Sequence, residues 1–154
     1  MKQGMKFAGA IVIVALLGMA FKAADNTEKK DKLNYFKGTY EEALAFAKKE
    51  NKAIFLDAYT SWCGWCKELD KKTFSDEDFS SYMNENYVNV KMDMETPEGV
   101  KIGQKYKVSG YPTILVIHKN GDLAHRIVGF LQAPAMMKEV KHAEKELKRI
   151  DARD

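Results

Sequence analysis

The stretch Trp62-Cys63-Gly64-Trp65-Cys66 contains both cysteines of the chain. An apolar run, residues 53–59, precedes it and predicts a buried strand, while residues 67–72 follow it and predict a helix. The beginning of a helix carries partial positive charge, which favours the thiolate form of a cysteine placed there. Because a thiolate, and not a thiol, attacks disulfides, this pattern indicates a pair of cysteines that exchanges electrons.

The composition is that of an ordinary globular domain. The chain has 154 residues, of which 45% are hydrophobic, and this length favours a single domain with a normal core. The formal net charge is +3, and lysines and glutamates are interspersed along the chain instead of forming blocks. Without a basic patch, nucleic-acid binding is excluded as a leading function.

The first twenty residues have a different character from the rest. Lys2 and Lys6 form a basic leader, and residues 7–21 are uncharged. As a helix this apolar stretch would span roughly 22 Å, short of the roughly 30 Å of a membrane core. Together with the small residues of Gly18-Met19-Ala20, it predicts that residues 1–20 are a secretory signal peptide. The alternative is an uncleaved anchor that tethers the protein to a membrane.

An exported protein is expected in the periplasm or another extracytoplasmic compartment, where a spare cysteine pair normally becomes a structural disulfide. Here only two residues separate the cysteines, so the closed loop is very small. Closing such a loop removes little entropy from the unfolded chain and stabilises the fold weakly. The spacing therefore favours a working redox pair over a structural one.

The remaining chain predicts a linker and N-terminal extension over residues 21–38, followed by one domain over residues 39–154. Within the extension, residues 33–36 are expected to form a short edge strand. Thr39 and Glu42 form a capping box that begins a helix ending near residue 51. Further strands are predicted over residues 53–58, 87–92, 113–117 and 123–128. Further helices are predicted to start at residues 75–78 and at Pro97, and a last one to cover 133–149.

This order predicts an α/β fold in which a mixed β-sheet is flanked by helices on both faces. Asn120-Gly121 predicts a tight two-residue hairpin turn. Helical periodicity predicts a buried group on the first helix, Leu44 with Phe46 or Ala47, and an apolar face on the second, Phe79, Tyr82 and Met83. The third helix carries Val100, Ile102 and Tyr106 toward Val108. On the last helix, the residues expected near one face are Met137, Val140, Leu147 and Ile150.

Three features of the chain together resemble the thioredoxin superfamily. Asp57 lies six residues before Cys63, the Cys-Gly-Trp-Cys pair follows a strand, and Tyr111-Pro112-Thr113 precedes another strand. The resemblance covers residues 39–150 and implies a thioredoxin-like fold. The stretch from Trp62 through Asp76 also resembles the C-terminal thioredoxin-like domain of the bacterial membrane thiol-disulfide interchange protein.

The resemblance implies catalytic roles for three residues. Cys63 matches the exposed nucleophile that attacks a partner's disulfide, and Cys66 matches the thiol that resolves the mixed disulfide. Asp57 matches a buried acid whose pKa burial would raise, so that it accepts a proton from Cys66 as a general base. The alternative is an aspartate at a strand end that only accepts hydrogen bonds from the backbone.

Three further positions are expected to form the surface that binds the partner. Pro112 matches the family's cis-proline, and Tyr111 beside it offers its backbone to an extended partner chain, as an added strand would. Gly129 matches a glycine that borders the partner groove, and a turn at a strand end is its alternative.

The residues around the two cysteines complete the predicted site. Trp62 matches the family's tryptophan and is expected to pack beside the cysteines, while Gly64 is expected to permit a tight start of the helix. Trp65 stands where the family usually has proline. We expect Trp65 to contact partners, with simple packing as the alternative.

No cofactor and no metal are expected. A zinc site would need four ligands, and none of the three histidines (His118, His125 and His142) has a motif spacing with the cysteines, so surface positions are predicted for them. The predicted function is an exported thiol-disulfide oxidoreductase that reduces protein disulfides and receives electrons from a membrane thiol carrier. The alternatives are a disulfide oxidase or isomerase, and a non-catalytic binding module with a permanent disulfide.

Overall fold

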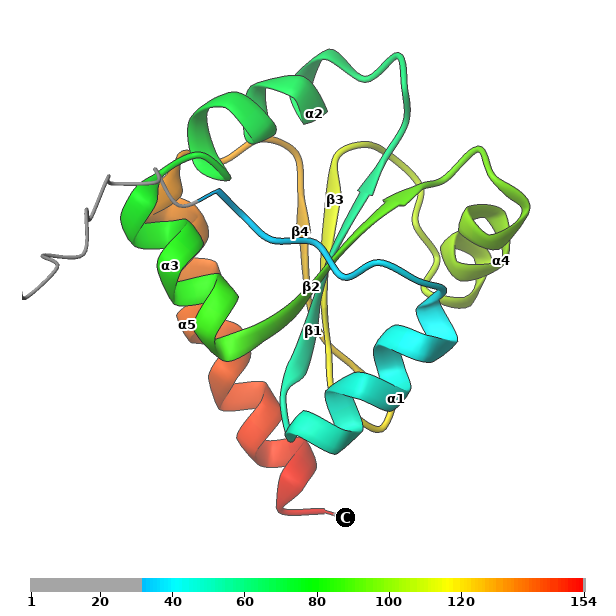
Figure 1. Ribbon diagram of the computed structural model, residues 1–154, viewed down its shortest axis with the longest axis vertical. Coiled ribbons are helices and arrows are strands. Elements are labelled where there is room, and N and C mark those ends of the chain that lie inside the picture. Colours follow the sequence, from blue (N-terminus) through cyan, green and yellow to red (C-terminus); the bar gives the residue numbers. More distant parts are fainter. Residues whose placement is uncertain (1–31, 154) are drawn as a thin grey trace, which may run out of the picture.

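A four-stranded mixed sheet in the order β2-β1-β3-β4 forms the centre of the molecule (Figure 1). The computed structural model describes residues 32–153, so the predicted signal peptide and most of the predicted linker lie outside the described residues. β1 (Ala53–Tyr59) pairs in parallel with β2 (Tyr87–Asp93) and antiparallel with β3 (Thr113–Ile117). β4 (Leu123–Val128) pairs antiparallel with β3. The predicted mixed sheet is confirmed.

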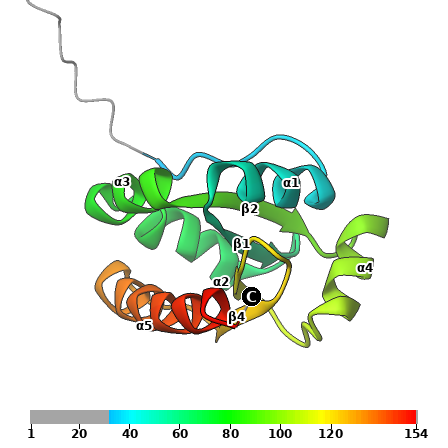
Figure 2. The ribbon, with the colours of Figure 1, turned by 90° about the horizontal axis from the view of Figure 1, so that it is seen from below.

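Helices cover both faces of the sheet, as predicted. α1 (Tyr40–Glu50) and α4 (Pro97–Lys105) pack on one face, and α3 (Glu77–Asn86) and α5 (Ala133–Asp151) pack on the other. Figure 2 shows α1 and α5 on opposite sides of the sheet. α2 (Gly64–Glu68) follows β1 and continues into one π-helical turn, η1 (Leu69–Thr73).

Strand β1 contributes to both halves of the core because successive side chains point to opposite faces. Ile54, Leu56 and Ala58 belong to the cluster under α1 and α4, whereas Phe55 belongs to the cluster under α3 and α5. Asp57 lies two residues after Phe55 and therefore shares its face. The period of the strand thus places a carboxyl group on an apolar surface.

The predicted helix starts are confirmed by their caps. The Thr39 hydroxyl accepts the backbone N–H of Glu42 at 3.2 Å, and the Glu42 carboxylate accepts the N–H of Thr39 at 2.8 Å. Asp76 caps α3, and Thr96 caps α4 with Pro97 in its first turn. Each cap satisfies N–H groups that have no partner inside the helix.

The predicted tight turn at Asn120-Gly121 is wrong. The connection between β3 and β4 has five residues, His118 to Asp122, and the N–H of His118 donates to the carbonyl of Asp122 at 2.8 Å. A two-residue turn of the predicted type needs positive φ at both central residues. Only Gly121 has it, with φ 95°, and the register shifts between Val116 and Ile117.

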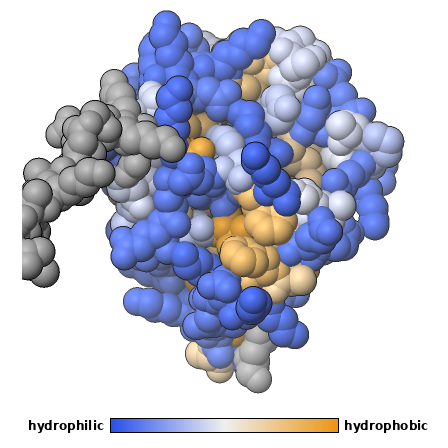
Figure 3. All heavy atoms as spheres, in the orientation of Figure 1, coloured by the Kyte–Doolittle hydropathy of each residue, from blue (hydrophilic) through white to orange (hydrophobic). Residues whose placement is uncertain are grey.

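Of the two alternatives predicted for the core on α1, Ala47 is buried and Phe46 is 40% exposed, with its ring centroid 5.4 Å from that of Phe36. Val100 is 47% exposed, whereas Ile102 on the same helix is 1% exposed. Each exposed residue sits beside the buried stripe of its helix instead of within it. On the face drawn in Figure 3, apolar residues gather over the middle of β2 and the adjoining part of α1.

The predicted edge strand at residues 33–36 is reduced to a single parallel bridge between Tyr35 and Asn89 of β2. The N–H of Phe36 donates to the carbonyl of Asn89 at 2.8 Å. The segment before α1 (residues 32–39) therefore lies along the outer edge of β2. Between residues 32 and 153, no helix is both long and apolar enough to cross a membrane.

The two side chains on α4 provide a matched test of the core. Ile102→Ala should lower the free energy of unfolding by about 2–4 kcal/mol, because it leaves a cavity in the core. Val100→Ala should change it by less than about 0.5 kcal/mol, because the valine is largely exposed. Urea unfolding of both variants measures this difference, and equal losses would contradict the packing of α4 described above.

Candidate active site

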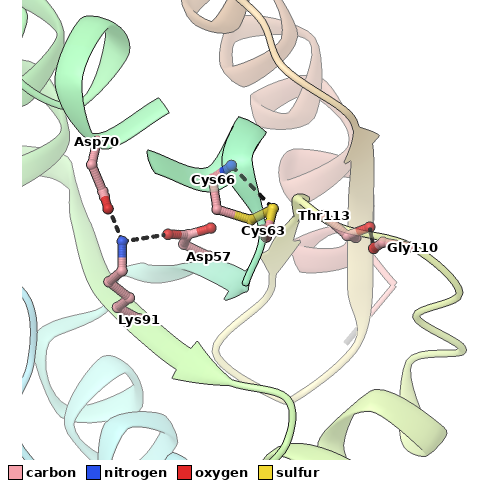
Figure 4. The surroundings of a disulfide bond; sticks show 7 residues. All are labelled: Asp57, Cys63, Cys66, Asp70, Lys91, Gly110 and Thr113. Atoms are coloured by element: carbon pink, nitrogen blue, oxygen red, sulfur yellow. Dashed lines mark hydrogen bonds and ion pairs between the residues drawn. A yellow bond between two sulfur atoms is a disulfide. The ribbon is translucent and has the colours of Figure 1, made fainter. Parts of the chain in front are cut away.

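The two cysteines form a disulfide at the start of α2 (Figure 4). Their Cα atoms lie 5.3 Å apart, and Cys63 is the N-cap residue of the helix. The Sγ atom of Cys63 accepts the backbone N–H of Cys66 at 3.1 Å. The sulfur thus lies at the positive end of the helix and beside an N–H donor, and both stabilise a thiolate once the disulfide is reduced.

The expected exposure of Cys63 is wrong for this disulfide-bonded form. Cys63 is 4% exposed and Cys66 is 2% exposed. The capping contact and the bond to Cys66 both turn the Cys63 side chain inward. The exposed groups at this end of the molecule are instead the neighbours Trp62, Gly64 and Trp65.

Gly64 is not needed for a tight start of the helix. Its φ does not lie in the left-handed region, and a Cβ atom added there would meet no other atom within 4 Å. What the glycine does is keep the surface beside Cys63 free of a side chain.

Asp57 lies beneath the disulfide, with its carboxyl group between Lys91 and Cys66 (Figure 4). The residue is 0% exposed, and burial raises its pKa from 3.8 to about 6, although the Lys91 ammonium group opposes that rise. Apart from the ion pair with Lys91, neither carboxylate oxygen has a hydrogen-bond partner among the described residues, backbone N–H groups included. The alternative, an aspartate that only accepts hydrogen bonds from the backbone, therefore finds no support.

Lys91 is the functional residue that the sequence prediction missed. It lies opposite Asp57 in the parallel pairing of β1 with β2, and its Nζ atom is 3.1 Å from Asp57 Oδ2. It also forms an ion pair with Asp70 of η1. These carboxylates raise the pKa of Lys91 although burial opposes the rise. The sequence signal for it is a lysine within the strand predicted over residues 87–92, but only the pairing register places that lysine opposite Asp57.

The loop before β3 lies on the other side of the cysteines. Figure 4 shows Gly110 and Thr113 on the side of Cys63 that is away from Lys91. The Tyr111–Pro112 peptide bond is cis, as the resemblance implies. The carbonyl of Pro112 accepts the N–H of Gly129 at 2.9 Å, and Gly129 has φ 90°. The positive φ explains a glycine at this position.

Aromatic side chains surround the disulfide at the surface. Trp62 is 67% exposed, its ring meets the edge of Tyr111 at 5.9 Å, and its Nε1 donates to Glu95 at 3.0 Å. Trp65 is 62% exposed and contacts the ring of Phe130 at 5.6 Å. Trp65 is thus a largely exposed side chain that packs on Phe130, and Glu95 is a contact that the sequence did not predict.

The histidines lie away from this site. His118 is buried and pairs with Asp151, so the predicted surface position is wrong for it. His125 contacts Glu139 at 2.7 Å, and its ring centroid is 5.1 Å from that of His142. Across residues 32–153, no group of three or more potential ligands could hold a metal ion.

A mixed sheet covered by helices on both faces, with a Cys-x-x-Cys disulfide at the start of α2, defines a thiol-disulfide oxidoreductase of the thioredoxin type. Comparison with known proteins agrees, because residues 40–144 match the family model described as a thioredoxin-like domain. The chain belongs to this family.

Several relatives resemble the chain over most of its length. The thiol:disulfide interchange protein DsbD of Haemophilus influenzae is 32% identical over 124 residues, which are 79% of this chain and 19% of that protein. DsbD of Campylobacter jejuni is 37% identical over 92 residues, which are 58% of this chain and 16% of that protein. The chain therefore spans less than a fifth of the length of these curated relatives.

Among solved structures, a proposed disulphide-isomerase of Bacteroides thetaiotaomicron matches with 42% identity and a TM-score of 0.68. The match covers 75% of this chain and 95% of that one. The oxidised C-terminal domain of Neisseria meningitidis DsbD matches with 23% identity and a TM-score of 0.59, covering 72% of this chain and 98% of that one. At that identity, the second match supports the fold alone.

The raised pKa of Asp57 predicts a characteristic dependence of stability on pH. The folded form holds a proton on Asp57 between about pH 4 and pH 6, where the unfolded chain has lost it, so stability falls as pH rises through this window. In the unmodified chain the free energy of unfolding should fall by on the order of 2–3 kcal/mol across this window, and Asp57→Asn should remove that fall. Urea unfolding of the oxidised chain from about pH 4 to about pH 8 measures it. Asp78→Asn, at an exposed site, is the control. Parallel curves for Asp57→Asn and the unmodified chain would contradict the burial effect.

Proposed function

We propose that this chain is an exported thiol-disulfide oxidoreductase that reduces disulfides in partner proteins. The observation that carries the proposal is the arrangement of Cys63, Cys66 and Asp57. One sulfur caps a helix, the second is bonded to it, and a buried carboxyl group lies beneath the second (Figure 4). This arrangement supplies a nucleophile, a resolving group and a base within one small region.

The first step starts from the reduced form, in which Cys66 carries a thiol and Cys63 has given its proton to water and is a thiolate. The Cys63 thiolate attacks one sulfur of the partner's disulfide, and that bond breaks as a mixed disulfide to Cys63 forms. The partner's second sulfur leaves as a thiolate and takes a proton from water. The helix start and the Cys66 N–H favour the attacking thiolate.

In the second step Cys66 releases the partner. Its thiol gives a proton to Asp57, the resulting thiolate attacks Sγ of Cys63, and the bond from Cys63 to the partner breaks. The partner's sulfur leaves as a thiolate and is protonated. Two electrons and two protons have then passed to the partner, and the chain holds the Cys63–Cys66 disulfide described here. With a pKa of about 6, Asp57 is mostly charged at neutral pH and is a stronger base than an ordinary aspartate.

The surface around the disulfide suits an extended partner segment. The exposed rings of Trp62 and Trp65 provide apolar contact area, and Gly64 between them leaves room beside Cys63. Tyr111 and Pro112 lie in the loop before β3, next to the cysteines. The N–H of Gly129 donates a hydrogen bond to the carbonyl of Pro112. We infer that the partner adds as a strand along residue 111 and rests on the two tryptophans.

A reductase outside the cytoplasm needs a supply of electrons. The basic and apolar leader in residues 1–20 supports export or a membrane tether. The similarity to DsbD proteins, which are named for thiol:disulfide interchange, supports a thiol carrier as the donor. We infer that a membrane thiol carrier reduces the Cys63–Cys66 disulfide after each turnover.

Reduction of insulin disulfides with dithiothreitol as electron donor tests the activity. The unmodified chain should turn over, and Cys63→Ser should abolish turnover because the attacking sulfur is absent. Cys66→Ser should instead accumulate mixed disulfides through Cys63, detectable on non-reducing gels. If Cys63→Ser trapped partners equally well, the assignment of the two sulfurs would be wrong. If the unmodified chain were inactive and resisted reduction by glutathione, a binding module would be favoured.

The reduction potential of the Cys63–Cys66 couple distinguishes a reductase from the second candidate, an oxidase or isomerase. The similarity to a proposed disulphide-isomerase favours that candidate. We expect a potential near the roughly −270 mV of thioredoxin. A potential near the roughly −180 mV of protein disulfide isomerase, or higher, would overturn the reducing direction. Equilibration with glutathione or dithiothreitol buffers, followed by thiol alkylation, gives the value.

A further inference from the structure

The Lys91 ammonium group contacts four side chains, two carboxylates and two aromatic rings. Asp57 lies 3.1 Å away and Asp70 forms a second ion pair. The ring centroid of Tyr59 is 4.9 Å from Nζ, and that of Tyr35 is 5.5 Å from it. Both distances allow a cation–π contact. The position of the charge that faces Asp57 is therefore set by two carboxylates and two aromatic rings.

Tyr35 belongs to a part of the chain that precedes the family match. The match begins at residue 40, whereas Tyr35 lies in residues 32–39, which run along the outer edge of β2 (Figure 1). The bridge to Asn89 and the hydrogen bond from Phe36 fix the backbone on both sides of Tyr35. This chain thus adds a ring to the surroundings of Lys91 from outside the matched domain.

Tyr35 and Asp70 also line one surface hollow. It has a volume of about 400 Å³ and lies between residues 32–35 and the η1 region. Asp70 is 46% exposed, whereas Asp57 is fully buried. Figure 4 shows Lys91 and Asp70 on the side of Asp57 away from the cysteines. Asp70 is thus the solvent-exposed end of the chain of ion pairs that leads through Lys91 to the buried carboxyl group.

We propose that Tyr35 is a positioning residue for the resolving step: its ring covers the Lys91 ammonium group beside Asp57 and limits the access of water from this hollow to the carboxyl group. This inference rests on the proposed role of Asp57 as the base for Cys66. The groups that face Asp57 and its lysine are Asp70, Tyr35, Tyr59 and the two cysteines. Burial raises the pKa of Tyr35, so this tyrosine stays neutral and acts by its ring.

Removing the ring has a definite consequence for Asp57. Burial is the largest cause of its raised pKa, and water admitted in place of the ring would solvate the charged carboxylate. Asp70 and the ring of Tyr59 still hold Lys91 beside Asp57 in Tyr35→Ala, so this variant should lower the pKa of Asp57. The Tyr35 hydroxyl is buried and makes no hydrogen bond with a described residue, so Tyr35→Phe should leave that pKa unchanged.

Carbon-13 NMR titration of the Asp57 carboxyl group in the oxidised full chain measures the effect directly. We expect Tyr35→Ala to lower the pKa by about half a unit to one unit. Phe36→Ala is the matched control, because Phe36 belongs to the same segment but packs on Phe46 instead of Lys91. It should leave the Asp57 pKa unchanged even where it lowers stability.

The kinetic counterpart uses a reaction of the reduced chain with Ellman's reagent, followed by absorbance in rapid mixing. The first thionitrobenzoate release reports attack by Cys63, and the second reports resolution by Cys66. The acid limb of the second phase should move to lower pH in Tyr35→Ala by the same amount, and Asp57→Asn should lack that limb. The first phase should keep its profile, since Cys63 does not use Asp57.

An unchanged Asp57 pKa in Tyr35→Ala, or an equal shift in Phe36→Ala, would overturn the inference. An equal shift in Tyr35→Phe would assign the effect to the hydroxyl and overturn the role of the ring. Should Tyr35→Ala not fold, Tyr35→Leu removes the aromatic face with less loss of volume, and the same outcomes apply. Absence of insulin turnover in the unmodified chain would defeat the proposed function, whereas the NMR titration still decides whether Tyr35 sets the Asp57 pKa.

Discussion

Burial of one carboxyl group governs the organisation of this end of the molecule. Asp57 lies on the apolar face of β1 with no exposed surface, because the two-residue period of the strand gives it the same orientation as the core residue Phe55. A charge in such a place is unfavourable unless another charge compensates it. Lys91 from the neighbouring strand does so only in part, since the pKa of Asp57 remains raised. The chain thus keeps a carboxyl group whose pKa is about 6, which makes it a stronger base than an ordinary aspartate.

The two sides of this carboxyl group differ in chemistry. Toward the cysteines the surface is aromatic, with Trp62 and Trp65 exposed on either side of Gly64. Toward the sheet edge it is charged, with Lys91 and Asp70 leading to solvent. A partner seated on the apolar side would leave the charged side open. This separation lets partner binding and proton release occupy different surfaces, which suits a reaction in which the partner stays covalently bound between two steps.

Two parts of the structure meet at the charged side, and one of them, the segment before α1, precedes the matched domain. The segment before α1 brings Tyr35 to Lys91, and the π-helical turn η1 brings Asp70 there. A π-helical turn interrupts the regular helix and often marks a functional site. The thioredoxin-like domain supplies the disulfide, the buried acid and the cis-proline loop. The added segment acts on the surroundings of that acid and not on the sulfurs themselves.

Most elements of the fold could be predicted because their signals are local. Helix caps such as Thr39 and Asp76, the strand before the cysteines and the Cys-x-x-Cys spacing depend on a few neighbouring residues, so the sequence alone determined the order of elements, the redox pair and the position of Asp57 on a strand. Contacts between distant segments were not predictable in this way. The pairing of β1 with β2 places Lys91 opposite Asp57. The rotation of α1 and of α4 about their axes leaves Phe46 and Val100 exposed and buries Ala47 and Ile102. The burial of Cys63 and the surroundings of Lys91 arise only when strands, helices and the edge segment pack together, because burial and ion pairing depend on groups far apart in the chain.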